Sequence, residues 1–210
     1  MGRIRLHAKQ EAAEQLDVCA FGGLTIYYQG SPITVLWESQ KARLLFSYLL
    51  VTYDQWVHRD KLIELLWPGC EVAAGTNNFK TTLSRLRKSF AGPRVLNPVI
   101  VQGEAVRINF QAISLDASRF RQNALNGVKM QLRGETKLAR PCLETAQDLY
   151  TGEFLPEEPF NPFITAARNE LSDLYDHVVK SLERIYRQEG NEEAVAAMLL
   201  LQKNLSPVLA

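Results

Sequence analysis

The clearest chemical pattern in the sequence is a cluster of basic side chains near the middle of the chain. The segment from 75 to 94 contains no acidic residue and five basic ones: Lys80, Arg85, Arg87, Lys88 and Arg94. Arginine can form two hydrogen bonds with guanine, asparagine can do the same with adenine, and a threonine methyl group can contact thymine. Lysine and arginine also bind phosphates, which positions a protein on DNA without reading its sequence. The cluster therefore indicates DNA binding.

These residues lie on a predicted helix that runs from about Gly75 or Thr76 to Phe90. Its apolar residues are spaced by 4, 3 and 4 positions, so they share one narrow face: Phe79, Leu83, Leu86 and Phe90. For base recognition we predict Arg85, Thr81 and Asn78, with Asn77 as a further candidate and Ser84 on the same outer face. For phosphate contacts we predict Lys80, Arg87, Lys88 and Arg94.

A basic helix is, taken alone, more often the solvated face of an ordinary surface helix. Two features favour DNA here. Surface helices usually mix charges of both signs, whereas this outer face carries no acid. The helix is also the third helix in an order of elements that is typical of DNA-binding domains.

That order is three short strands, three helices and a hairpin, which is the plan of a winged helix–turn–helix. The expected strands are 16–21, 24–28 and 33–36, separated by glycine-containing turns. The first helix is expected from residue 38 to about 53, and the second covers 59–67 and stops at Pro68-Gly69. Val57 can form a brief strand, and 99–101 with 106–108 forms the hairpin. From residue 116 the pattern is helical, with helices expected over 116–131, 135–150, 161–188 and 191–203, a series typical of tetratricopeptide-like pairs.

Composition narrows the function further. Residues 1–110 carry 13 basic and 9 acidic side chains, a net charge of +4, whereas residues 111–210 carry 11 and 14, a net charge of −3. Only the first half is thus expected to meet an acidic partner. The three cysteines and three histidines show no metal-ligand or nucleophile spacing, so we expect reduced thiols in the cytoplasm, no metal, no cofactor and no enzymatic activity. No apolar run is long enough to span a bilayer.

Several segments together resemble a known family. LIELLWP (62–68), Asn77-Asn78 and LSRLRK (83–88) resemble the OmpR/PhoB-type winged helix, in the variant found in Streptomyces antibiotic regulatory proteins (SARPs). In that family the winged helix is followed by a bacterial transcriptional activator domain (BTAD). Four segments of this chain are similar to that domain: LDASRF (115–120), AQDLYTGEFL (146–155), FITAARNEL (163–171) and residues 190–194.

The resemblance implies an α+β winged helix–turn–helix followed by an all-α tetratricopeptide-like domain. We expect a linker or cloning remnant over 1–15, the DNA-binding domain over 16–110, and a truncated BTAD-like domain over 111–210. By position, the DNA-facing part of the recognition helix contains Thr81, Thr82, Arg85 and Arg87. The wing lies near 102–107, which adds Arg107 as a predicted DNA contact. The family's wing has an aromatic residue in a Gly-Tyr-x-Leu segment, whereas this chain has Ala105-Val106-Arg107-Ile108.

The same resemblance implies an activator that binds promoter repeats as side-by-side protomers and recruits RNA polymerase through its sigma factor or alpha subunit. The alternative is a protein-interaction adaptor, in which the helical half binds a partner and the winged helix does not bind DNA. Salt-sensitive binding to promoter DNA distinguishes the two.

Overall fold

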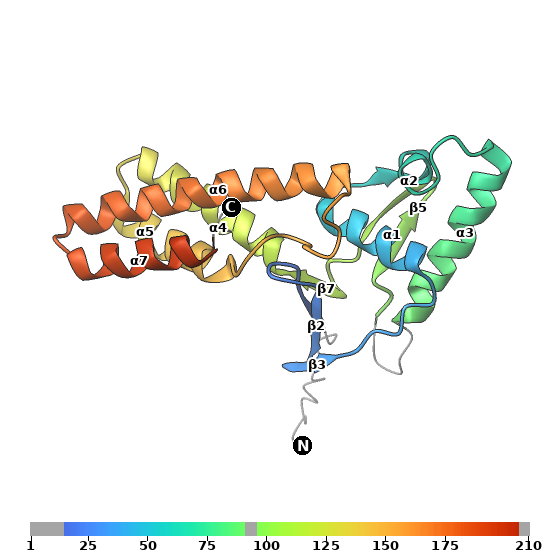
Figure 1. Ribbon diagram of the computed structural model, residues 1–210, viewed down its shortest axis with the longest axis horizontal. Helices are drawn as coiled ribbons and strands as arrows, with labels where there is room; N and C mark the ends of the chain where they lie inside the picture. The colour runs from blue at the N-terminus through green and yellow to red at the C-terminus, as the bar shows by residue number, and fades with distance from the viewer. Residues whose placement is uncertain (1–14, 91–95, 206–210) are drawn as a thin grey trace, which may run out of the picture.

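The computed structural model describes residues 15–90 and 96–205, and for 201–205 the backbone alone. The described chain is elongated (Figure 1). Helix α3 lies at one end of the long axis, and the turn between α6 and α7 lies at the other. The proposed linker over residues 1–15 falls almost entirely outside the described residues.

The N-terminal sheet has the strand order β3-β2-β1-β7. Three antiparallel strands are present as predicted: β1 (Leu16–Cys19), β2 (Thr25–Tyr28) and β3 (Ser31–Ile33). The third begins earlier than expected because Gln29 and Gly30 both adopt positive φ and make a two-residue turn, after which pairing resumes at once. The fourth strand, β7 (Ile113–Leu115), was not predicted and runs parallel to β1.

The helix–turn–helix and wing follow the predicted order. Helix α1 (Gln40–Val51) begins two residues later than expected because the Ser39 hydroxyl accepts a hydrogen bond from the amide of Ala42 and caps it. Helices α2 (Arg59–Leu66) and α3 (Val72–Ser89) come next. The wing is a three-stranded sheet with the order β4-β6-β5, formed by β4 (Val57–His58), β5 (Val99–Gln102) and β6 (Ala105–Ile108).

The C-terminal half is helical, as predicted. Helix α4 (Asp116–Leu132) packs on α5 (Thr136–Leu149), and both pack on α6 (Pro162–Gln188), which in turn packs on α7 (Glu192–Leu205). Helices α4 and α5 approach closely at Gly127, where a Cβ would lie 2.6 Å from Cγ of Leu143. Successive helices fold back on one another in the tetratricopeptide-like manner (Figure 1).

One hydrophobic core runs through both halves. Phe21, two residues beyond β1, packs against Phe120, Tyr150 and Phe154, with ring centroids 5.4, 4.7 and 6.0 Å away. The carboxylate of Asp116 accepts hydrogen bonds from the amides of Ala20, Phe21 and Ala117. Among the described residues, no helix is long and apolar enough to cross a membrane.

Candidate nucleic-acid interface

Helix α3 is held by a continuous apolar face. Phe79, Leu83 and Leu86 are buried against the rest of the winged helix, as the predicted stripe requires. Beyond the last turn, the ring of Phe90 packs against Phe46 at 5.1 Å and Trp37 at 5.5 Å between centroids. This aromatic cluster fixes the end of α3 relative to α1.

The start of α3 is set by close packing against α2. The helix begins at Val72, three residues before the predicted start, because Gly75 is a packing residue rather than a helix boundary. A Cβ on Gly75 would lie 2.7 Å from Cγ2 of Ile63 and 2.9 Å from Sγ of Cys70. The turn between the two helices contains Gly69, whose φ of 70° is in the left-handed region. The glycine at 75 thus lets the two helices of the helix–turn–helix touch.

The opposite face of α3 is open to solvent. Its exposed members include most of the predicted contact residues: Asn77, Asn78, Lys80, Thr81, Ser84, Arg85 and Lys88. Within the ranges that the structure describes, none of these seven side chains forms a hydrogen bond or an ion pair. Their donors and acceptors are therefore available to a ligand along more than two turns of one helix.

Three predicted contacts differ from this set. Thr82 is 4% exposed and lies on the buried side beside Leu83, so the prediction that it faces DNA is wrong; the buried stripe is wider than the spacing of large apolar residues indicated. Arg87 is half-buried, with its Nε inaccessible and without a hydrogen-bond partner. Arg94 lies outside the described residues.

Ion pairs fasten the wing to α2. The Arg59 guanidinium pairs with the carboxylate of Glu104 at the wing tip, and the Arg59 amide donates to the Glu104 carbonyl at 2.8 Å. His58 Nε2 lies 3.3 Å from the same carboxylate. This contact could not be predicted from the sequence because 45 positions separate Arg59 from Glu104 and no local pattern links them. A groove of about 180 Å³ separates this tip from Thr76, Phe79 and Lys80 of α3.

Arg107 does not lie at the wing tip. On β6 its guanidinium carbon is 4.5 Å from the ring centroid of Trp56 and 4.7 Å from that of Phe110, so it is held between two aromatic rings. Phe110 packs in turn on Tyr53, at 4.9 Å. A DNA contact by Arg107 stays a prediction.

Comparison with known proteins gives a family match for the helical half. Residues 115–208 match the family model of the bacterial transcriptional activator domain. No curated protein matches the chain. Among solved structures, Mycobacterium tuberculosis EmbR in complex with a low-affinity phosphopeptide is similar in fold, with a TM-score of 0.70 and 20% sequence identity.

That similarity covers 89% of this chain and 49% of the EmbR chain, so this chain spans about half the length of that protein. It extends over the winged helix as well as the helical half. Residues 115–208 therefore match the bacterial transcriptional activator domain family, and the chain shares the fold of the corresponding part of EmbR, a winged helix followed by a helical domain.

Proposed function

We propose that the chain is a sequence-specific DNA-binding activator that inserts α3 into the major groove of promoter DNA. The observation that carries this proposal is the exposed, acid-free face of α3, whose polar side chains have no partners among the described residues. Arginine, asparagine and threonine on such a face are suited to base edges, and lysine is suited to flanking phosphates.

The rest of the proposed activity follows from the architecture. We propose that protomers bind side by side on direct repeats and that the bound chain recruits RNA polymerase through its sigma factor or alpha subunit. This activity belongs in the cytoplasm, where promoter and polymerase are found. The activator domain family supports recruitment, and the open face of α3 supports DNA binding.

The test separates base reading from phosphate binding. Duplexes selected from a random pool by the full chain supply the cognate site, and fluorescence anisotropy measures affinity for this duplex and a scrambled one over a range of salt. Arg85→Ala is expected to lose about 1–3 kcal/mol of discrimination between them. Lys88→Ala is expected to weaken both duplexes alike and to reduce the log–log salt slope by roughly 0.9, the value for one phosphate.

Lys180→Ala is the matched control, because Lys180 is an exposed lysine on α6, in the other half of the chain. It should leave both affinities unchanged. Binding that is absent, or insensitive to salt, would contradict the proposal and favour the adaptor function. A selected site with inverted rather than direct repeats would contradict the side-by-side arrangement.

A further inference from the structure

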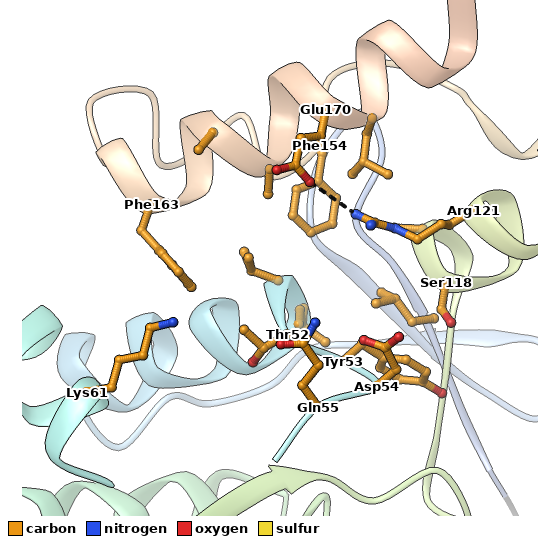
Figure 2. Close-up of a pocket in the computed structure, with 17 residues that line it drawn as sticks. Thr52, Tyr53, Asp54, Gln55, Lys61, Ser118, Arg121, Phe154, Phe163 and Glu170 are labelled. Atoms are coloured by element: carbon orange, nitrogen blue, oxygen red, sulfur yellow. Dashed lines mark ion pairs between the residues drawn. The ribbon is translucent and has the colours of Figure 1, made fainter. Parts of the chain in front are cut away.

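A cavity of about 270 Å³ opens where the winged helix meets the helical half (Figure 2). The winged helix contributes the end of α1, the loop that follows it and Lys61 of α2. The helical half contributes the first turns of α4 and α6, together with Phe154. Any molecule in this space touches both halves of the chain.

The lining of the cavity mixes polar side chains with an apolar floor. Phe154 and Leu115 are 1% exposed, and Leu171 is 3% exposed, so these side chains belong to the core and lie beneath the floor of the cavity. Phe163 forms one side (Figure 2). The space is somewhat smaller than the usual range for drug-sized ligands, and it suits a ring with a short chain.

The charged side chains at one end of the cavity form an ion pair, whereas the lysine at the other end does not. At one end Arg121 lies 3.7 Å from the carboxylate of Glu170, and Asp54 lies on the same side (Figure 2). At the other end the Lys61 ammonium lies 5.6 Å from the centre of the Phe163 ring and has no carboxylate partner among the described residues. Lys61 is therefore the cation in this cavity that is free to receive an anion.

Two neutral polar groups in the lining are also without partners. The Ser118 hydroxyl and the Gln55 side-chain amide form no hydrogen bond within the described residues. They can serve a polar substituent on the ligand without breaking any contact of the protein.

We propose that this cavity binds a small carboxylate with an apolar, ring-sized body. The carboxylate pairs with the exposed Lys61 ammonium, and the apolar body packs against the half-buried Phe163 over the floor of the cavity. A ligand held in this way bridges α2 to α6, and this binding is independent of whether α3 contacts DNA.

Isothermal titration calorimetry on the full chain tests the proposal with three probes of one shape. These are 3-phenylpropionate, the uncharged 3-phenylpropanol and the cationic 3-phenylpropylamine. The carboxylate is expected to bind saturably at one site, and the alcohol and amine at least tenfold more weakly. Lys61→Met should weaken carboxylate binding by roughly ten- to a hundredfold, because it removes a charged hydrogen-bond donor and keeps the aliphatic stem.

Two further variants locate the binding. Lys180→Met removes an exposed lysine on α6 and should change nothing. Ala166→Phe places a ring at an exposed lining position and should abolish binding, with circular dichroism reporting that the fold is kept. The proposal is overturned if the carboxylate does not bind saturably, if the alcohol binds as tightly, or if either Lys61→Met or Ala166→Phe leaves the affinity unchanged.

Discussion

Arginine side chains in the N-terminal half occupy three different environments, and each environment gives the same residue type a different task. Arg85 is exposed on α3 and free to bind. Arg59 is committed to the wing-tip carboxylate of Glu104. Arg107 packs against the rings of Trp56 and Phe110. Composition and charge counts treat these three as equivalent, so the assignment of roles depends on burial and partners that only the folded chain provides.

Asp116 gives a prediction at this scale. Burial raises the pKa of this carboxyl above its ordinary value of 3.8, and this effect outweighs the hydrogen bonds from the amides of Phe21, Ala20 and Ala117, which act in the opposite direction. Since the folded chain holds the proton more tightly than the unfolded chain, the stabilisation linked to Asp116 is full below pH 3.8 and is lost as pH rises through the folded-state pKa.

Urea unfolding of the wild-type chain and of Asp116→Asn over pH 3.5 to 7 measures this linkage. The free energy of unfolding of the wild type minus that of the variant should fall with rising pH and then level off. Other titrating groups cancel in this difference. An increase with pH would show instead that the three backbone hydrogen bonds dominate and that the carboxylate is the favoured form.

At the scale of elements, local sequence patterns predicted the helices whose ends are set by nearby turn residues. Helices α4 to α6 were predicted within one residue at each end because their boundaries are marked by turn residues, such as Gly134 and Gly190, whose positive φ ends the preceding helix region. Strand β7 was missed because three residues carry little pattern, and its partner β1 lies far away in the sequence.

Most of the exposed side chains of α3 were predicted, whereas Thr82 and Arg87 are more buried than expected. The spacing of large apolar residues placed Thr82 beside the core stripe, whereas the structure buries it. A threonine at the border of a stripe can be polar surface or core filler, and the sequence alone does not distinguish these. The wing's attachment to α2 and the aromatic sandwich around Arg107 likewise depend on tertiary contacts that no local pattern indicates.

Gly75 provides the prediction at this scale. Gly75→Ala should gain about 1 kcal/mol from helix propensity, yet the added methyl would overlap Ile63 and Cys70, and such overpacking costs about 1–3 kcal/mol. We expect a net loss of stability, measured by urea unfolding, together with weaker DNA binding as α3 is displaced from α2.

The double variant Gly75→Ala, Ile63→Ala is the control for this mechanism. Because it removes the Cγ2 atom that the new methyl would strike, alanine at 75 should cost less in this background than in the wild type. Equal effects in both backgrounds would mean that crowding against Ile63 is not the cause.

At the scale of the whole molecule, the two halves are joined by more than a linker. Glu158, in the loop before α6, pairs with Arg43 of α1 at 2.7 Å, and the Asn161 side-chain amide donates to the Tyr48 hydroxyl at 2.7 Å. The shared aromatic cluster around Phe21 adds buried apolar contact. The winged helix and the helical half therefore share polar contacts and a common core.

A single cooperative unfolding transition follows from this shared core. Differential scanning calorimetry should show one peak whose calorimetric and van't Hoff enthalpies agree. Phe21→Ala should lower the temperature of the whole transition, at a cost of about 3–5 kcal/mol, rather than that of one half. Two separated peaks in the wild type would contradict the shared core.

The parallel pairing of β1 with β7 also has a consequence for synthesis on the ribosome. The 93 residues between the two strands must be translated before β1 can pair with β7. At bacterial elongation rates of about 5–20 residues per second this delay is roughly 5 to 20 s. During that interval one edge of β1 stays open to other chains, so slow or paused translation between residues 20 and 112 should favour aggregation of the nascent protein.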